Sequence, residues 1–322
     1  MSQKIVTVVG STGQQGKAVI AAFAGNPQYR IRGVSRNPDS AAAKALISAG
    51  IEVVQADLND LNSLTAAFQG SHIVFGVTDF WNLFRIHGPI KSKEIEREQA
   101  SNLVRAASAT PTLEHYIWST LPKGSKDYPV YHFEGKSEAD DLIRRDPFLL
   151  PRTTLFMVCY YANNLQIASF RPYWIETANK YVQFTTYDSE TIIPFIGAVD
   201  NVTPFIKAII ANPEKTKNGT MVIGSIGQWT AKKWVEEWAA ARGAQAHLVQ
   251  ISRKDYRALW PWPRWSEEFA LMMDYFKFVP LQDWTESGLN ILTAENLNVT
   301  PVETLEEWAK TYDLPDSSDV SY

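Results

Sequence analysis

The segment that most restricts the fold lies at the start of the chain, where an apolar run is followed at once by three spaced glycines. Residues 5–9 read Ile-Val-Thr-Val-Val, a run typical of a strand buried on both faces of a parallel sheet. Gly10, Gly13 and Gly16 follow directly, and a helical stretch begins at the last of them. In this order of strand, glycine loop and helix, backbone N–H groups and a helix N-terminus bind a pyrophosphate. The opening of the chain therefore predicts a dinucleotide-binding unit.

The three glycines have separate expected roles in this loop. Gly10 permits the tight turn, Gly13 lets the backbone approach the pyrophosphate, and Gly16 lets the helix pack closely on the strand. The residues between them are also expected to contact the cofactor, and these are Thr12, Gln14 and Gln15.

The choice of cofactor is predicted from the end of the second expected strand, residues 29–34. An NAD binder usually places a carboxylate there to hold the ribose 2′-hydroxyl, but this chain has Ser35 and Arg36. A guanidinium pairs with the 2′-phosphate of NADP and stacks on adenine, which favours NADP(H). The alternative is that Arg36 is a solvated loop arginine.

Later strand ends supply the other expected cofactor contacts. Asp57, with Leu58, follows the third strand, and Asp57 either meets the adenine edge or caps the next helix. Thr78 follows the fourth strand, in the segment that usually passes the nicotinamide ribose in dinucleotide-binding folds of this kind. Phe80 and Trp81 come next, and they either wall the nicotinamide pocket or only pack.

Strand and helix patterns alternate through residue 157. Strands are expected at residues 5–9, 29–34, 51–56, 73–77, 116–118 and 153–157, and helices at 16–24, 41–49, 61–68, 90–108 and 132–145. This alternation predicts an α/β fold, a Rossmann-type doubly wound parallel sheet over residues 1–157. A smaller, irregular α+β domain for a substrate or partner is expected over residues 158–322. Within it, residues 192–211 are expected to return to the first domain, with 192–199 as a strand and 204–211 as a helix.

The sequence resembles the NmrA-like family, whose members are atypical proteins of the short-chain dehydrogenase/reductase superfamily. The resemblance rests on Gly10-x-x-Gly13-x-x-Gly16, Ser35-Arg36-Asn37-Pro38, Ala56-Asp57-Leu58, Trp118-Ser119-Thr120-Leu121, His132-Phe133-Glu134-Gly135-Lys136, and Leu155-Phe156-Met157 leading to Asn163-Asn164-Leu165. It implies a Rossmann domain, a preference for NADP(H) and a smaller C-terminal domain that roofs a cleft. Some members of that family are reductases, and others bind nicotinamide cofactors as redox sensors or transcriptional co-regulators.

The catalytic motif of the superfamily is altered in this chain. Typical members use Tyr-x-x-x-Lys, in which the tyrosine exchanges a proton and the lysine holds the nicotinamide ribose. This chain has His132-x-x-x-Lys136, so a histidine stands at the tyrosine position. Lys136 is either a cofactor ligand or an ordinary helix lysine. His132 either donates a proton or only caps or packs at the helix start, and Tyr131 is a second possible donor.

Two further groups of residues are candidates for the substrate side. Ser119 and Thr120 follow the fifth strand, where the superfamily places the hydroxyl that orients a substrate carbonyl. Trp260, Trp262 and Trp265 alternate with prolines, which predicts an extended loop. These tryptophans either line an aromatic pocket or fill the gap between the domains.

Composition excludes several other classes of function. The net charge of −4 argues against direct binding of nucleic acid, and no stretch is apolar for long enough to span a membrane. The single cysteine, Cys159, lies in an apolar run and is interpreted as a core residue. The five histidines are scattered, so no metal site is expected. A cytoplasmic location is expected, with nuclear entry left open, and no pattern sets an oligomeric state.

These patterns predict an NADPH-dependent reductase that acts on a small aromatic or polycyclic carbonyl or enone. Hydride would come from the nicotinamide, and the proton from His132, Tyr131 or water. The alternative is a non-catalytic NADP(H) sensor that binds a regulatory protein in place of a small-molecule substrate.

Overall fold

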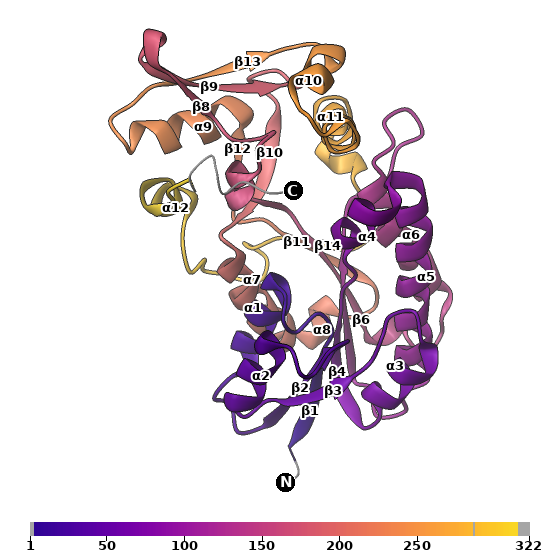
Figure 1. Cartoon of the computed structure of the whole chain (residues 1–322). Coiled ribbons are helices and arrows are strands. Elements are labelled where there is room, and N and C mark those ends of the chain that lie inside the picture. Colours follow the sequence, from indigo (N-terminus) through magenta and orange to yellow (C-terminus); the bar gives the residue numbers. More distant parts are fainter. Residues whose placement is uncertain (1–2, 286, 315–322) are drawn as a thin grey trace.

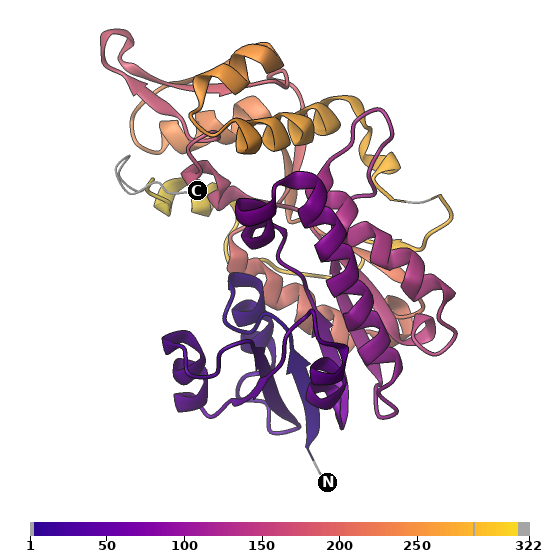
Figure 2. The same ribbon diagram turned by 45° about the vertical axis from the view of Figure 1, so that its right-hand side comes forward.

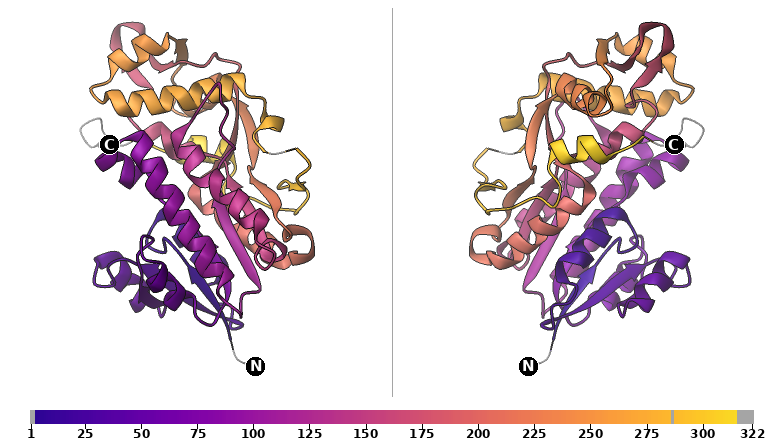
Figure 3. Two further views of the ribbon diagram at one scale, coloured as in Figure 1. Left: turned by 90° about the vertical axis from the view of Figure 1, so that its right-hand side faces the viewer. Right: turned by 90° about the vertical axis from the view of Figure 1, so that its left-hand side faces the viewer.

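The computed structural model describes residues 3–285 and 287–314 (Figure 1). Residues 1–2, 286 and 315–322, the last of which end the expected C-terminal domain, lie outside the described residues. Within the described part of the chain, eight parallel strands form one large sheet, and helices cover both of its faces (Figure 3). The predicted doubly wound α/β fold with a smaller C-terminal domain is confirmed.

The first half of the chain builds most of this sheet. Its strands are β1 (Lys4–Val8), β2 (Tyr29–Ser35), β3 (Glu52–Gln55), β4 (Ser71–Gly76), β5 (His115–Thr120) and β6 (Thr153–Val158). Its helices are α1 (Gln14–Phe23), α2 (Ala41–Ser48), α3 (Leu61–Phe68), α4 (Phe80–His87), α5 (Pro89–Ser108) and α6 (Tyr131–Arg145). The strand order β3-β2-β1-β4-β5-β6 reverses between β1 and β4. Ligands of such sheets bind at this reversal, beyond the carboxyl ends of the strands.

Helix α4 is the element of this half that the sequence did not predict. Its N-cap is Asp79, whose carboxylate accepts hydrogen bonds from the backbone N–H groups of Trp81 and Asn82. Asp79 therefore begins a helix where a connecting segment was expected.

The second half of the chain extends the large sheet at a different place from the one predicted. The expectation that residues 192–199 return to this sheet is wrong, because β10 (Ile192–Gly197) pairs with β7 (Tyr160–Tyr161) and β12 (Gly227–Thr230) in a separate sheet. The strands that do return are β11 (Thr220–Gly224), beside β6, and β14 (Ile291–Leu292), beside β11. An apolar run predicts that a strand forms, but it does not show with which other strand it pairs. That depends on where the connecting segments place it.

The helix after β10 does lie against the large sheet domain. Helix α7 (Val202–Ala211) packs beside α1, and the hydroxyl of Thr203 donates a hydrogen bond to the carbonyl of Ala18 at 2.8 Å. The short α8 (Pro213–Thr216) then leads into β11.

The remaining elements form the smaller domain above the carboxyl ends of the strands (Figures 1 and 2). A second small sheet contains β8 (Tyr173–Ile175), β9 (Lys180–Thr185) and β13 (Ala246–Gln250). The helices are α9 (Ala231–Ala240), α10 (Arg253–Leu259), α11 (Pro263–Phe278) and α12 (Leu305–Thr311). Figure 1 shows α11 next to α4, over the end of the large sheet.

The proline-rich stretch at residues 260–265 is only partly the extended loop that was predicted. Helix α11 begins at Pro263, so Arg264 and Trp265 are helical. Proline is tolerated in the first turn of a helix because the N–H group that it lacks has no intrahelical partner there. Only Trp260, Pro261 and Trp262 form the connection from α10.

The core on one face of the sheet is shared between the two domains. Buried side chains under α5 and α6, such as Leu103 and Trp118, belong to one cluster with Trp234 and Phe269 of the C-terminal domain. A separate cluster fills the other face under α1 and α7. The shared core fixes α11 above the strand ends, where the candidate site lies.

Candidate active site

The glycine loop has the geometry of an anion cradle. Gly10 adopts a φ of +65°, a conformation that L side chains rarely adopt, and its carbonyl accepts the N–H of Gly13 at 2.9 Å. A Cβ at Gly16 would collide with that same carbonyl, so only glycine fits there. No side chain caps α1, which leaves the N–H groups of its first turn for an anion. The loop therefore fits the pyrophosphate of a dinucleotide, with Gly13 and Gln14 exposed and Thr12 half-buried.

Arg36 lies just beyond the carboxyl end of β2, in the position expected for a 2′-phosphate ligand. Its side chain is exposed and forms no ion pair or hydrogen bond within the described residues. The guanidinium is therefore available to an anion at the adenosine end of the loop.

Asp57 and Leu58 lie in the turn after β3. The proposed cap on the next helix is wrong for Asp57, because Asp60 caps α3 through the N–H groups of its first turn. Asp57 instead accepts the backbone N–H and the side-chain amide of Asn59, both at 2.8 Å. The carbonyl of Leu58 accepts the amide of Asn102 at 2.9 Å, which fixes this turn on α5.

A cavity of about 590 Å³ lies beyond the carboxyl ends of β4, β5 and β6, beneath α11. It begins at the glycine loop and continues under the C-terminal domain. The predicted site residues in its wall are Gln14, Gln15, Thr78, Trp81, Ser119, Thr120, His132, Lys136 and Trp265. Residues in the wall that the sequence reasoning missed include Tyr160, Tyr161, Asn164, Phe269, Met272 and Trp284.

Four of the residues predicted for catalysis or for the substrate pocket lie outside the wall of this cavity. Phe80 is buried behind it, with its ring centroid 5.3 Å from that of Trp81. Tyr131 is half-buried at the start of α6, with the ammonium of Lys93 over its ring. Trp260 packs against Tyr173 and Tyr256, and Trp262 lies in the connection before α11. Trp260 and Trp262 miss the cavity because they precede the helix that carries Trp265 into it.

Aromatic side chains from α4 and α11 close one side of the cavity. Trp81 and Trp265 stack with their centroids 5.1 Å apart and an interplanar angle of 14°, and Phe269 lies 5.2 Å from Trp81. The ring of His132 lies 4.8 Å from that of Trp81. The wall can therefore pack against a flat, apolar ligand.

The side chain of Gln15, at the glycine loop, forms a hydrogen bond with one residue of each domain. Its carbonyl oxygen accepts the hydroxyl of Ser119 at 2.9 Å, and its amide donates to the hydroxyl of Tyr161 at 2.9 Å. Ser119 thus faces the cofactor loop. The hydroxyl of Thr120, on the other face of β5, lies 3.0 Å from a carboxylate oxygen of Asp140.

The ammonium group of Lys136 is held by Thr78 and Glu96. Its Nζ donates to the carbonyl oxygen of Thr78 at 2.6 Å and to the hydroxyl of Thr78 at 2.7 Å, and it forms an ion pair with Oε1 of Glu96 at 3.0 Å. Glu96 is completely buried, and a side chain at the neighbouring Gly135 would collide with it. A ribose hydroxyl at Lys136 would compete with these contacts.

His132 does not cap α6, whose N-cap is Val130. It forms a buried pair with Glu268 of α11. Oε1 of Glu268 accepts from the backbone N–H of His132 at 3.0 Å and lies 2.7 Å from its Nδ1. The carboxylate holds the hydrogen on Nδ1, so the second ring nitrogen, Nε2, has no partner within the described residues.

Cys159 also reaches the cavity wall, but its chemistry is that of a core residue. Its side chain is buried, and burial raises the pKa of the thiol to about 12. A thiol that stays protonated is a poor nucleophile, which agrees with the sequence interpretation.

Among the helices described, none is long and apolar enough to cross a membrane.

Comparisons with known proteins agree with this architecture. Residues 2–309 match the model of the NmrA-like family. The NmrA-like family domain-containing oxidoreductase FrzB of Cladobotryum sp. is 46% identical over 239 residues, which cover 68% of each chain. NmrA, a negative transcriptional regulator solved with NADP, has a TM-score of 0.71 at 18% identity over 97% of this chain and 95% of its own.

The fold is shared with an enzyme as well as with a regulator. The NADPH-dependent quinone oxidoreductase QOR2 of Escherichia coli, solved with NADPH, has a TM-score of 0.66 at 18% identity, over 94% of this chain and 98% of its own. At this identity the two solved structures bear on the fold alone. The family match spans nearly the whole length, and so the chain belongs to the NmrA-like family.

Proposed function

We propose that the chain is an NADP(H)-dependent reductase that acts on a small aromatic or polycyclic carbonyl compound or enone. The observation that carries the proposal is a continuous cavity that joins the glycine loop to an aromatic wall containing His132. FrzB, at 46% identity, is named an oxidoreductase, and QOR2 supports a reductase on this fold.

The cofactor would be held by residues that fit it chemically. The glycine loop and the uncapped α1 would bind the pyrophosphate, and Arg36 would bind the 2′-phosphate that distinguishes NADP from NAD. Thr78 and Lys136 lie in the cavity wall where the nicotinamide ribose is expected. When bound, NADPH supplies a hydride to the substrate.

His132 would supply the proton. Glu268 would accept from Nδ1–H and hold the ring in place, which leaves Nε2 for a ligand in the cavity that His132 lines. A proton passes from Nε2 to the substrate oxygen, or to the carbon of an enone, as the hydride arrives. Ser119 and Thr120 would orient the carbonyl oxygen from the end of β5.

The substrate class follows from the size and lining of the cavity. About 590 Å³ is within the usual range of roughly 300–1,000 Å³ for small-molecule sites, and part of this space would receive the nicotinamide. Trp81, Trp265 and Phe269 offer ring faces and edges to a flat ligand.

The test is oxidation of NADPH in the presence of aromatic ketones, quinones and enones. Turnover of at least one compound is expected. His132→Phe should lower the rate by about 10²–10⁴-fold and leave NADPH affinity unchanged, since in this proposal the imidazole donates the proton and does not contact the cofactor. The matched control is His247→Phe, an exposed histidine on β13. Full activity of His132→Phe would refute its role as the proton donor.

A second candidate function is a non-catalytic NADP(H) sensor that binds a regulatory protein. It is favoured by the histidine at the tyrosine position and by Lys136, whose ammonium group is already bound by Thr78 and Glu96. NmrA, which has this fold, is a negative transcriptional regulator. Tight NADPH binding without oxidation by any member of the panel would favour this sensor.

A further inference from the structure

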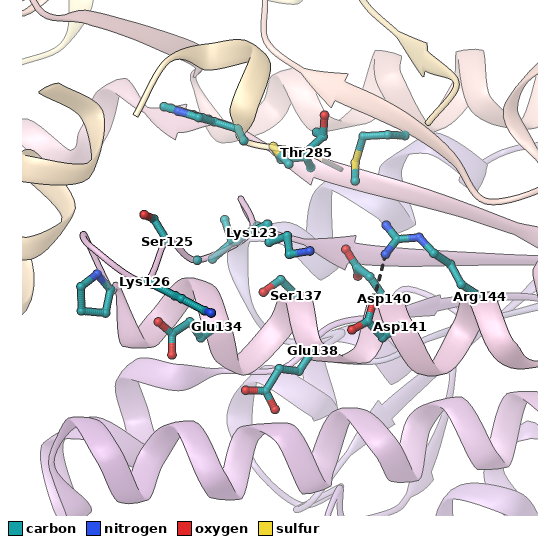
Figure 4. A pocket seen from close by; sticks show the side chains of 16 residues that line it. Lys123, Ser125, Lys126, Glu134, Ser137, Glu138, Asp140, Asp141, Arg144 and Thr285 are labelled. Atoms are coloured by element: carbon teal, nitrogen blue, oxygen red, sulfur yellow. Dashed lines mark hydrogen bonds and ion pairs between the residues drawn. The ribbon is translucent and has the colours of Figure 1, made fainter. Parts of the chain in front are cut away.

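A second, smaller cavity of about 260 Å³ lies beside the first, between α6 and the loop after β5 (Figure 4). Its wall is rich in charged groups. Lys123 comes from the loop, and Asp140 and Arg144 come from α6. The two cavities share Leu121, Met157 and Trp284 as a partition.

Asp140 and Thr120 form a contact across this partition. Thr120 lies in the wall of the larger cavity and Asp140 in the wall of the smaller one, and their side-chain oxygens are 3.0 Å apart. The other oxygen of Asp140 accepts the indole N–H of Trp118 at 3.0 Å. Because an indole only donates, that bond fixes Oδ1 as an acceptor whether Asp140 is ionised or protonated.

We propose that the protonation state of Asp140 sets the direction of the Thr120 hydroxyl, and thereby how well the larger cavity binds a carbonyl oxygen. Ionised Asp140 only accepts, so Thr120 must direct its hydrogen to Oδ2. Protonated Asp140 donates from Oδ2 to Thr120, whose own hydrogen then becomes available to an oxygen in the cavity. Within the chain, the other acceptor of that hydrogen is the carbonyl of Leu121, at a long 3.4 Å.

The surroundings of Asp140 place this change near neutral pH. Burial raises the pKa of Asp140 to about 7, and the charge of Asp141 raises it too. Arg144 and the hydrogen bonds from Thr120 and Trp118 act in the opposite direction. The other titratable groups that face it across the strand and the smaller cavity are Tyr116, Lys123, Lys126, Glu134 and Glu138. Asp140 is thus a positioning residue, which acts through Thr120.

The inference rests on the proposed function where it assigns a carbonyl oxygen to Thr120. We therefore test it first by binding of two probes, 2-acetylnaphthalene and its counterpart without oxygen, 2-ethylnaphthalene. Affinity for the ketone should rise about three- to tenfold as pH falls from about 8.5 to 5.5, the value of one added hydrogen bond. Affinity for the hydrocarbon should not change. The series is repeated in His132→Phe, so that the imidazole in the same cavity wall cannot contribute to the pH dependence.

Two variants should separate the states of the pair. In Asp140→Asn, Trp118 still holds Oδ1, so the amide must donate to Thr120, and ketone affinity should stay high at every pH. In Thr120→Val, ketone affinity should stay low at every pH. Ketone binding by the wild type that does not depend on pH would overturn the proposal, as would an unaltered pH dependence in Asp140→Asn.

A measurement without ligand makes this test independent of the substrate class. The indole ¹⁵N–¹H resonance of Trp118, assigned by its loss in Trp118→Phe, should titrate near neutral pH and stop titrating in Asp140→Asn. Its midpoint should move to higher pH in Thr120→Val, because the carboxylate loses a donor. A midpoint that does not move would refute the coupling. If neither naphthalene binds, the proposed substrate class fails, and the Trp118 titrations alone decide this inference.

Discussion

Helix α6 carries two buried pairs of a basic side chain and a carboxylate, one turn apart, and they differ in what they join. Lys136 pairs with Glu96 on the adjacent α5, inside the Rossmann domain. His132 pairs with Glu268 on α11, across the boundary between the domains and 136 residues away in the chain. Both carboxylates are buried, with 0% and 1% of their surface exposed.

The two pairs also differ in what they leave unused. The Lys136 ammonium is bound by Thr78 and Glu96, whereas Nε2 of His132, a residue of the cavity wall, has no partner within the described residues. A basic group whose contacts all lie within one domain mainly stabilises the fold, and a ring nitrogen without a partner can act on a ligand. In the proposed mechanism, the same helix therefore uses one pair to fix the strand ends and the other to present the proton donor.

Breaking the pair within the Rossmann domain should have the largest effect. Glu96→Ala leaves the buried Lys136 ammonium without its carboxylate and should lower the free energy of unfolding by roughly 3–5 kcal/mol. Urea denaturation measures this change. The double variant Glu96→Leu/Lys136→Met should lose less than Glu96→Ala does, because no unpaired charge remains. A double variant that is less stable than Glu96→Ala would show that the unpaired charge is not the main cause of the lost stability.

Weakening the pair between the domains should reduce turnover more than stability. Glu268→Gln keeps the shape of the side chain but replaces the carboxylate that accepts from Nδ1–H of His132 with a neutral amide, so kcat should fall by about 10²-fold or more. NADPH affinity should not change. Steady-state kinetics with the best compound of the panel test this, with the neighbouring Glu267→Gln as the control. Loss of NADPH affinity in Glu268→Gln would show that the pair serves the cofactor instead.

Unlike Lys136 and His132, the Arg36 side chain has no partner within the described residues. Arg36→Ala should leave stability unchanged and reduce the preference for NADP(H) over NAD(H) by about tenfold, since a charged hydrogen bond contributes roughly 1.5–3 kcal/mol. Titration of both cofactors measures the ratio. Arg30→Ala, which removes an exposed partner of Glu52, is the control. Equal affinities for the two cofactors in the wild type would disprove the assignment.

The smallest effect is expected at Tyr131, the residue next to His132. Its ring lies outside the cavity wall, so Tyr131→Phe should change stability by no more than about 0.5 kcal/mol and leave turnover unaltered. The contrast with His132→Phe then shows which of two adjacent residues reaches the substrate. A large loss of turnover in Tyr131→Phe would make the tyrosine the proton donor.

The parts of the fold that the sequence predicted are those encoded by short segments. The glycine loop, the strands on either side of it and α6 follow from glycine spacing, apolar runs and helical periodicity within about 20 residues. For the same reason, most of the expected residues around the strand ends, including Ser119, His132 and Lys136, lie together in one cavity.

The parts that were missed depend on contacts between distant segments. Nothing near Glu268 or Glu96 in the sequence indicates that each meets a basic residue of α6. Likewise, the apolar run of β10 does not reveal that it joins a separate sheet, whereas β11 joins the large one. Residue type alone made Trp260, Trp262 and Trp265 candidates for the pocket, with filling between the domains as the alternative. The start of α11 at Pro263 decides that, of these three, only Trp265 enters the wall.

The late return of the chain to the large sheet has a consequence for biosynthesis. Strand β6 is buried along its whole length, but its outer neighbour β11 begins at Thr220 and the final edge, β14, ends at Leu292. While a nascent chain emerges from the ribosome, β6 therefore has an unpaired apolar edge until β11 is made. An edge of this type promotes aggregation. A fragment that ended at residue 157 would keep this edge permanently. The Rossmann domain is continuous in space but not in the gene, and it completes its sheet only when most of the protein has been translated.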